Sequence, residues 1–450
     1  MIMDIVSVDF SQKKGAIKPM HCTNNGPVYK WASDQRITNL PYFQEAGIPY
    51  ARVHDSSFYA TYGGEHIVDV NMIFTNPDAD PYDPASYDFD LTDDYFKVIE
   101  LGGSKVFYRL GSKIEHWRKK YNTLPPKDFK KWAIVCEHII RHYCYGWANG
   151  FNMDIQYWEI WNEADNTPEG SAHNPCWSGT DQQFYDLFRI TLEHLKTTFP
   201  SLKIGGPSLT TINHEEWAQK LIDNLGDIKP DFFSWHVYND RVEKMVEKMR
   251  MARAFLDKNG LTECESILNE WNYVKDWWGD AWEYSLKVDK SLKGAAFISA
   301  TMLASQDEPL DMLMYYDARP GGMNGMFNTD CVRERLKGSY PFYMFNQLYK
   351  QKTQVSATVD GNNLYAVGAS GEEQTVVITH YDDDDNAPAK QVKIEFTGVE
   401  NEGKVKLEYY CLDEKNDCAL VREEIFTANE FACYLTLPVY TTYLLKIVKL

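Results

Sequence analysis

Two glutamates in this chain directly follow short apolar stretches, which sets them apart from the other acidic residues. Glu163 ends the segment Ile155-Gln-Tyr-Trp-Glu-Ile-Trp-Asn-Glu163, and Glu270 follows Ser266-Ile-Leu-Asn269. Both segments have the length and the Ile, Leu, Tyr and Trp content of buried strands. Two carboxyl groups that face each other can cleave an acetal, provided that one is protonated and the other ionised. The pair therefore predicts glycoside-bond chemistry.

The rest of the chain must bring these two strand ends together. Eight alternations of a short strand with a helix are expected between residues 16 and 350. The expected strands are 17–21, 50–54, 105–109, 155–163, 202–207, 231–236, 266–270 and 311–316, and the expected helices are 33–47, 92–102, 126–145, 181–198, 214–225, 241–259, 283–304 and 340–350. This alternation is typical of a parallel sheet, either doubly wound or closed. The count of eight, with polar residues at successive strand ends, favours a (β/α)8 TIM barrel, and no Gly-x-Gly-x-x-Gly follows the first strand.

The sequence changes character after Lys350. Short alternating strands are expected near 356–359, 364–367, 375–379, 392–396, 405–409 and 443–448. They predict a C-terminal antiparallel β-sandwich over residues 351–450, which the N-terminal residues 1–15 are expected to join. The acidic run 382–385 lacks the ligand spacing of an EF-hand and is interpreted as a solvated hairpin tip. The segment 56–90 is expected to be a long functional loop beside the site.

Composition and charge narrow the classes of partner. The 450 residues carry a formal net charge of −19, so neither nucleic acid nor an anionic membrane is expected as a partner. The N-terminus lacks a basic region followed by an apolar one, so we expect a cytoplasmic protein, or a secreted one if a signal peptide has been removed. The nine scattered cysteines are expected to be reduced, and no metal or cofactor is expected.

Several motifs along most of the chain resemble those of one enzyme family. The central pair is Trp161-Asn-Glu163 and Asn269-Glu270-Trp-Asn272. The other matching segments are Arg52-Val-His54, Tyr87-Asp-Phe-Asp90, Thr92-Asp-Asp-Tyr95, Tyr108-Arg-Leu-Gly111, Ile114-Glu-His116, Gly205-Gly-Pro-Ser208 and Ser234-Trp-His-Val-Tyr238. In these segments the chain resembles glycoside hydrolase family 39, a family of β-xylosidases and α-L-iduronidases within the clan of retaining (β/α)8 hydrolases. A β-sandwich after the barrel is also what the resemblance implies.

The resemblance assigns roles to individual residues. It implies that Glu163 is the general acid/base and Glu270 the nucleophile of a double displacement, which requires about 5–5.5 Å between the carboxyl groups; about 6.5–9.5 Å would mean inversion. Asn162 would bind the sugar 2-hydroxyl, and Arg52 would keep the nucleophile ionised. The residues implied to line the sugar site are His54, His116, His236 and Tyr238.

Two more candidate site residues come from the residue types alone. For most of the candidate site residues, a purely structural role is the alternative interpretation. Trp271 is a candidate for stacking on the sugar, and Arg319 after the eighth strand is a candidate for binding a sugar carboxylate. The alternative interpretation of Arg52 is a structural salt bridge at the barrel mouth, and that of His54 and His116 is a buried histidine with a structural role. Trp117, Trp277 and Trp278 are further candidates for stacking on sugar, and core packing is the competing role for each of them and for Trp271.

Several functions stay open at this point. A retaining glycosidase that releases a terminal sugar, with a β-xyloside as the first choice of substrate, is the leading hypothesis. An α-L-iduronide ranks lower because no convincing second cation accompanies Arg319. Arabinosides, galactosyl-arabinosides and endo-action on a polysaccharide are further alternatives, as is a catalytically silent carbohydrate-binding protein. A homo-oligomer formed through the β-domain is compatible with each of them.

Overall fold

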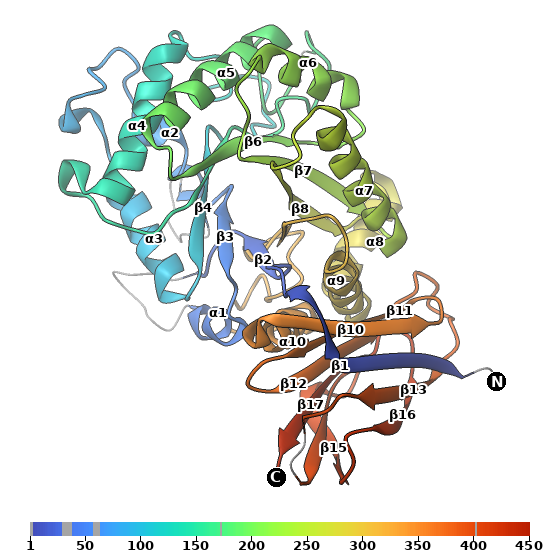
Figure 1. Cartoon of the computed structure of the whole chain (residues 1–450). Coiled ribbons are helices and arrows are strands. Elements are labelled where there is room, and N and C mark those ends of the chain that lie inside the picture. The colour runs from blue at the N-terminus through green and yellow to red at the C-terminus, as the bar shows by residue number, and fades with distance from the viewer. Residues whose placement is uncertain (1–2, 29–37, 57–63, 172, 401–402) are drawn as a thin grey trace.

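Eight parallel strands close into a barrel in which each strand pairs with the next along the chain and the last pairs with the first. They are β2 (Cys22–Asn24), β3 (Tyr50–Val53), β4 (Lys105–Leu110), β5 (Tyr157–Ile160), β6 (Lys203–Leu209), β7 (Phe232–Asn239), β8 (Glu265–Tyr273) and β9 (Met312–Tyr315). The computed structural model describes residues 3–28, 38–56, 64–171, 173–400 and 403–450. The TIM barrel predicted from the sequence is confirmed (Figure 1).

Helices between the strands cover the outside of the barrel (Figure 1). They are α1 (Leu40–Ala46), α2 (Val70–Ile73), α3 (Asp90–Leu101), α4 (Phe129–Tyr145), α5 (Asp181–Thr198), α6 (Glu215–Leu225), α7 (Val242–Lys258), α8 (Gly279–Asp289), α9 (Leu292–Ser305) and α10 (Tyr340–Gln351). A capping box between Thr180 and Gln183 satisfies backbone donors at the start of α5, which begins where the sequence predicts. The expected helix 33–47 and loop 56–90 lie partly outside the described residues, at 33–37 and 57–63.

Two local predictions differ from the structure. The first barrel strand begins at Cys22 rather than within 17–21, because Pro19 offers no N–H and the Met20 N–H turns back to the Lys18 carbonyl at 2.9 Å. The single helix expected at 283–304 is two helices, α8 and α9. Ser291 adopts an extended conformation and its side chain accepts a hydrogen bond from the Gly294 N–H, so it starts a new helix.

The barrel interior changes from apolar to polar along the strands. Phe107, Tyr157 and Phe232 lie on β4, β5 and β7, yet their ring centroids are only 5.2–5.6 Å apart, so they meet inside the barrel. Side chains in a strand alternate between its two faces, so the next inward residue on β5 is Glu159 and on β7 is Ser234. These polar side chains are fully buried. The apolar layer closes the N-terminal end of the barrel, and the polar layer lies toward the C-terminal end.

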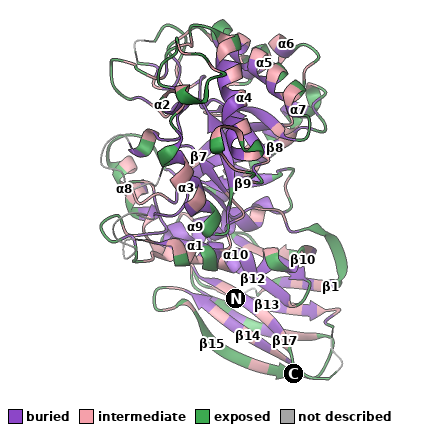
Figure 2. Ribbon diagram, turned by 90° about the vertical axis from the view of Figure 1, so that its left-hand side faces the viewer, coloured by how far each residue is buried: buried purple, intermediate pink, exposed green. Residues whose placement is uncertain are grey.

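The second domain is a sheet of nine strands in the order β15-β14-β17-β12-β11-β10-β1-β13-β16. The strands are β1 (Asp4–Ala16), β10 (Thr353–Asp360), β11 (Leu364–Ser370), β12 (Gln374–His380), β13 (Lys390–Thr397), β14 (Val405–Leu412), β15 (Asp417–Phe426), β16 (Phe431–Leu437) and β17 (Thr442–Lys449). The N-terminal strand β1 runs antiparallel to β10 and parallel to β13. The strands β15 and β16 were not predicted, because β15 exposes most of its side chains and lacks a buried alternating face (Figure 2).

Hydrogen bonds join all nine strands into one sheet, which folds over a single apolar core. Its two edge strands meet, because the rings of Phe426 on β15 and Phe431 on β16 stack with centroids 4.0 Å apart. The sheet packs against α9 and α10 of the barrel (Figure 1), where the Ser299 hydroxyl lies 2.6 Å from that of Thr379. The β-domain is therefore attached to the last two barrel helices.

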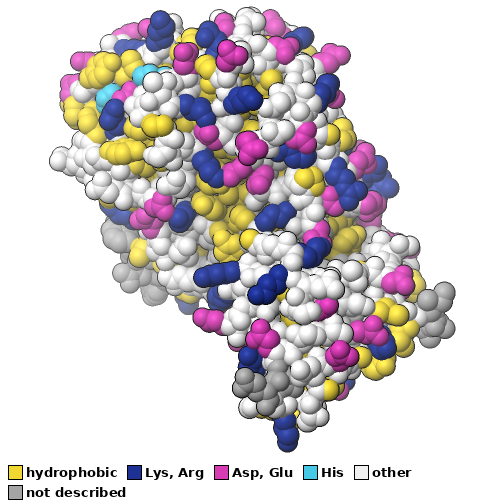
Figure 3. All heavy atoms as spheres, in the orientation of Figure 1, with side chains coloured by type: hydrophobic (Ala, Val, Ile, Leu, Met, Phe, Trp, Pro, Cys, Tyr) yellow, Lys and Arg dark blue, Asp and Glu magenta, His cyan; other side chains and the backbone are white. Residues whose placement is uncertain are grey.

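Two further features of the structure are the distribution of charged side chains on the surface and the state of the cysteines. Lysine, arginine, aspartate and glutamate side chains are interspersed over the face shown in Figure 3. All nine cysteines are free thiols. Among the described residues, none of the helices combines the length and the apolar character needed to span a bilayer.

Candidate active site

Glu163 and Glu270 meet at the C-terminal end of the barrel. Glu163 lies just after β5, and Glu270 lies within β8. An oxygen of each carboxyl group and a ring nitrogen of His236 all lie within 4.8 Å of one another. Glu163 is 6% exposed and Glu270 is 3% exposed, so both carboxyl groups are largely withdrawn from water. The two carboxyl groups are therefore close enough to act on the same bound group.

A sharp backbone turn aims Glu163 at its partner. Trp161 and Glu163 both have left-handed backbone conformations, with φ of 72° and 49°, which is uncommon for residues other than glycine. The Trp161 indole N–H donates to the Cys176 carbonyl at 2.9 Å, and the Glu163 N–H donates to the Ser208 carbonyl at 2.9 Å. A neighbouring loop and strand β6 therefore hold a conformation that costs about 1–3 kcal/mol per residue.

A β-bulge aims Glu270. The pairing of β7 with β8 shifts between Trp235 and His236, so that Asn269 has no partner of its own across the ladder. Asn269 and Glu270 consequently both reach the interior, where Asn269 donates to Glu159 at 2.5 Å and Glu270 accepts from Arg52 at 2.7 Å. Bulges re-aim side chains in this way beside active sites.

Arg52 is the central cation of the site and is fully buried. The guanidinium group makes five hydrogen bonds, using the planar set of donors that only arginine offers. Its acceptors are Glu159 Oε2 (2.7 Å), Glu270 Oε1 (2.7 Å), Asn162 Oδ1 (2.7 Å), Ser208 Oγ (2.8 Å) and Asn24 Oδ1 (2.9 Å). One side chain thus fixes Glu270, the amide beside Glu163 and the polar layer beneath them.

Glu159 is a third buried carboxylate, and sequence reasoning missed it. It accepts hydrogen bonds from Arg52, from the Ser234 hydroxyl at 2.6 Å and from the Asn269 amide at 2.5 Å. A charged residue at an inward position of an otherwise apolar strand was the available signal. Glu159 supports Arg52 from below, so the guanidinium group is held between two carboxylates.

Burial raises the pKa of both central carboxyl groups, but the charges next to the two groups differ. The pKa of Glu163 is raised to about 7, first by burial and then by the negative charge of Asp165. Burial also raises the pKa of Glu270, but the positive charge of Arg52 opposes the rise. Glu270 accepts two short hydrogen bonds, from Arg52 and from the Tyr238 hydroxyl at 2.9 Å. The hydrogen bond from the Arg52 cation therefore stabilises the ionised form of Glu270 against the effect of burial.

His236 connects the two carboxyl groups. Its Nδ1 lies 2.7 Å from Glu163 Oε1 and 3.5 Å from Glu270 Oε2, and its Nε2 lies 2.7 Å from Ser208 Oγ. Burial lowers the pKa of this imidazole to about 4, so the ring is neutral at neutral pH. Ser208, which the sequence singled out only within a matching segment, also contacts Arg52 and Asn162. It links the surroundings of one carboxyl group to those of the other.

Asn162 keeps one donor free beside this pair. Its Oδ1 accepts from Arg52 at 2.7 Å and from the Ser208 hydroxyl at 3.1 Å. Its Nδ2 is buried and, among the described residues, has no hydrogen-bond partner. A buried donor without a partner is costly, which suits an atom that hydrogen-bonds a ligand hydroxyl.

The remaining histidine and arginine candidates are His54, His116 and Arg319, and they lie at different distances from the two central glutamates. His54 is buried, with its Nδ1 3.9 Å from Glu270 Oε1, and burial lowers its pKa well below the ordinary value. His116 is exposed in the loop after β4. Arg319 pairs with Asp55 at 3.1 Å and with Glu65 at 3.6 Å rather than with either central glutamate. Lys113 joins the same cluster and lies 3.2 Å from Asp55.

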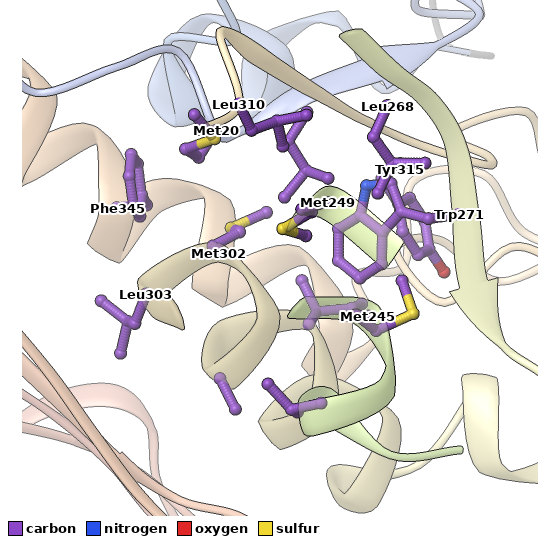
Figure 4. Close-up of a cluster of buried hydrophobic side chains, with 14 of the residues drawn as sticks. Met20, Met245, Met249, Leu268, Trp271, Met302, Leu303, Leu310, Tyr315 and Phe345 are labelled. Atoms are coloured by element: carbon purple, nitrogen blue, oxygen red, sulfur yellow. The ribbon is translucent and has the colours of Figure 1, made fainter. Parts of the chain in front are cut away.

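Trp271 is not part of the site, contrary to the expectation from its type and position. Because Glu270 points into the barrel, the next side chain on β8 points out toward the helices. Figure 4 shows Trp271 in the apolar cluster between the barrel and its helices, together with Met245, Met249 and Tyr315. Its ring is fully buried and lies 5.5 Å from that of Tyr315. Trp271 therefore packs the core.

The group formed by Glu163, His236 and Glu270 has the ligand types and spacing to hold a cation. The Arg52 guanidinium group already lies 2.7 Å from Glu270 and supplies positive charge there.

Comparisons with known proteins place the chain in a family. The family described as "Glycosyl hydrolases family 39" matches residues 30–317. A β-xylosidase from Caldicellulosiruptor saccharolyticus is 24% identical over 318 residues, which cover 66% of this chain and 58% of that protein. A β-xylosidase from Geobacillus stearothermophilus is 23% identical over 200 residues, which cover 39% of this chain and 35% of that protein. The alignments thus reach about half the length of these relatives or less.

Similarity in structure extends over the whole chain. A glucosidase from Croceicoccus marinus, whose crystal structure is known, superposes with a TM-score of 0.82 at 20% identity and covers 100% of both chains. At that identity the superposition shows a shared fold and a shared arrangement of the two domains. It leaves the substrate to be argued from the site.

Proposed function

Since the chain belongs to glycosyl hydrolase family 39, we propose that it is a retaining glycosidase that releases a terminal sugar, with a β-xyloside as the preferred substrate. The observation that carries the proposal is the pair of buried carboxyl groups with oxygens within 4.8 Å of each other. This proximity supports attack by one carboxylate on the anomeric carbon, because a pair that activates a water molecule lies farther apart, at about 6.5–9.5 Å.

The reaction then proceeds in two displacements. In the first, Glu270 forms a bond to the anomeric carbon while the bond to the leaving oxygen breaks and Glu163 transfers its proton to that oxygen. In the second, Glu163, now ionised, takes a proton from water, and the water oxygen displaces Glu270 from the anomeric carbon. The configuration is inverted twice and therefore retained.

Contacts around the two glutamates support these roles. Arg52 and Tyr238 hydrogen-bond Glu270, which favours its ionised form and fixes its orientation. The raised pKa of Glu163, about 7, keeps a proton available near neutral pH. The free amide donor of Asn162 would bind the sugar 2-hydroxyl, a hydrogen bond that strengthens as charge develops on the ring.

The choice of sugar rests on the relatives and on the charges at the barrel mouth. The two curated relatives are β-xylosidases, which supports a xyloside. A uronic acid would need free cations, but Arg319 and Lys113 both pair with Asp55, so their charges are compensated within the protein. A silent binding protein has no use for two buried acids that face each other.

Nitrophenyl glycosides of xylose, glucose, arabinose, galactose and iduronic acid test the substrate, and proton NMR of the first-formed anomer tests retention. We expect the β-xyloside to be cleaved with the β-anomer formed first. Glu163→Gln and Glu270→Gln should each lose most of the activity while remaining folded. Glu169→Gln, an exposed carboxylate in the same loop as Glu163, is the matched control and should keep its activity. Normal turnover by both site variants would contradict the proposal.

A further inference from the structure

Three tryptophans lie within six residues of one another after β8, the strand that carries the proposed nucleophile. Trp277 and Trp278 lie in the connection between β8 and α8, and Trp282 lies in the first turns of α8. Trp277 is 46% exposed and Trp278 is 82% exposed. Tryptophan is on average one of the more buried residue types, so two adjacent exposed indoles point to a binding surface.

Two of the three indole rings are in contact with each other, and one of these two also contacts a residue of the site. Trp277 stacks on Trp282, with centroids 5.3 Å apart and an angle of 26° between the rings. The Tyr238 ring meets Trp277 edge-on at 5.0 Å. The same Tyr238 donates its hydroxyl hydrogen bond to Glu270 at 2.9 Å. A continuous line of contacts thus leads from the nucleophile through Tyr238 to Trp277, and the more exposed Trp278 is the next residue in the chain.

The β-domain fixes the segment that carries these rings. Asp383, in the connection between β12 and β13, accepts a hydrogen bond from the Tyr273 hydroxyl at 2.7 Å and pairs with Lys275 at 3.1 Å. Lys293 also pairs with Asp383, at 2.9 Å. The Lys275 N–H donates to the Ser285 hydroxyl at 2.9 Å, which ties the segment to α8. The acidic run 382–385, interpreted from the sequence as a solvated tip, therefore anchors the two domains together.

We propose that Trp277, Trp278 and Trp282 form a platform that binds the pyranose ring on the leaving-group side of the cleaved bond. A β-linked pyranose presents flat C–H faces, and these pack on indole rings in the way that aromatic side chains pack in cores. The platform lies beyond Tyr238, outside the buried polar groups that surround the ring to be cleaved. This inference rests on the proposed glycosidase function and extends it from the cleaved sugar to its neighbour.

The exposure of the platform fits a neighbour that is only partly enclosed. Glu163 and Glu270 are 6% and 3% exposed, whereas Trp278 is 82% exposed. The cleaved ring would therefore be enclosed by polar side chains that read its hydroxyl groups, and the next ring would rest on an open apolar face. Such a face tolerates different hydroxyl patterns, because stacking requires only a flat side.

The test compares two substrates that share the cleaved sugar. β-Xylobiose carries a sugar as its leaving group, whereas β-xylosyl fluoride carries only fluoride. In Trp278→Ala and Trp277→Ala, we expect the ratio of kcat/KM for xylobiose to that for the fluoride to fall about threefold to tenfold, as the loss of one ring contact implies. Trp117→Ala removes another exposed indole, 78% exposed in the loop after β4, and is the matched control whose ratio should not change.

Binding measurements separate this inference from the proposed function. In the Glu270→Gln background, calorimetric titration with xylobiose should show weaker binding when Trp278 is replaced by alanine and unchanged binding when Trp117 is replaced. Wild-type protein that cleaves neither substrate would refute the proposed β-xylosidase activity, while the titration would still decide the platform. An unchanged substrate ratio together with unchanged binding would overturn the platform. So would an effect of Trp278→Ala confined to the sedimentation coefficient, which would assign the surface to contact with a second copy of the chain.

Discussion

Removing the charge of Arg52 should move the acidic limb of the pH–rate profile to higher pH. The Arg52 Nη1 lies 2.7 Å from Glu270 Oε1, and neither side chain is more than slightly exposed. At an effective dielectric constant of about 20, two unit charges at this distance attract by roughly 6 kcal/mol. Part of that energy offsets the burial of both groups, so the pKa of Glu270 should rise by less than the Coulomb energy alone implies. An adjacent arginine commonly lowers the pKa of a carboxyl group by about 1–3 units, which is about 1.4–4 kcal/mol.

The sign of the effect follows from the form of Glu270 that reacts. Because the nucleophile must be ionised, activity is lost as the pH falls through its pKa. In Arg52→Met that pKa should rise by about 1–3 units, so the acidic limb of kcat/KM should move upward by the same amount. The substitution also leaves Glu159 without its cation, and a buried charge that loses its partner costs about 3–5 kcal/mol of folding stability. Circular dichroism melts must therefore accompany the kinetics.

Arg52→Lys is the matched comparison, because it keeps a positive charge but loses the planar set of donors. We expect its acidic limb to move less than that of Arg52→Met, while kcat falls because the hydrogen bonds to Asn162 and Ser208 are weakened. The assay is kcat/KM for a nitrophenyl β-xyloside from pH 4 to pH 9 on both variants and on the wild type. An acidic limb that coincides in all three proteins would refute the assignment of Arg52 as the group that keeps Glu270 ionised.

Three further predictions concern the neighbours of the carboxyl pair. Tyr238→Phe removes the 2.9 Å hydrogen bond to Glu270. In steady-state kinetics, kcat should fall about tenfold and KM should change less. An equal effect on kcat and KM would contradict this prediction. Asp165→Asn removes a negative charge that raises the pKa of Glu163. The basic limb of kcat/KM should therefore move from near pH 7 to lower pH, and a move to higher pH would contradict this effect of Asp165 on Glu163. Asp383→Ala removes the contacts of this carboxylate with Tyr273 and Lys275 between the two domains. A loss of about 1–3 kcal/mol of folding free energy should lower the melting temperature by several degrees. An unchanged melting temperature would show that the contact does not stabilise the protein.

The fold was predictable from the sequence because the barrel repeats one simple pattern. Each strand is a short apolar stretch that ends in polar residues, and most helices carry one apolar face with recognisable ends, as the capping box of α5 illustrates. Strand β15 had no such signal, since its side chains are mostly exposed and it is defined by its partner β14. The break between α8 and α9 depends on the backbone conformation of a single serine, Ser291, inside a stretch with helical composition.

The central glutamates were predictable for the same reason, because a carboxylate that follows a buried strand stands out. The direction of neighbouring side chains was not predictable. The bulge at Asn269 lets two successive residues of β8 reach the interior and sends Trp271 to the core, and no residue type marks a bulge in advance. Glu159 and Ser208 act through contacts between strands that are far apart in the sequence. Those contacts exist only after the barrel closes.

The central claim is that Glu270 forms a covalent bond to the sugar while Glu163 transfers the proton. Incubation with 2-deoxy-2-fluoro-β-xylosyl fluoride should slow the second displacement and trap the glycosyl-enzyme. Mass spectrometry of proteolytic peptides should then place one fluoroxylosyl group on the peptide that contains Glu270, and the adduct should be absent from Glu270→Gln. An adduct on Glu163 or Glu159 instead, or turnover of the natural glycoside with the α-anomer formed first, would contradict the account.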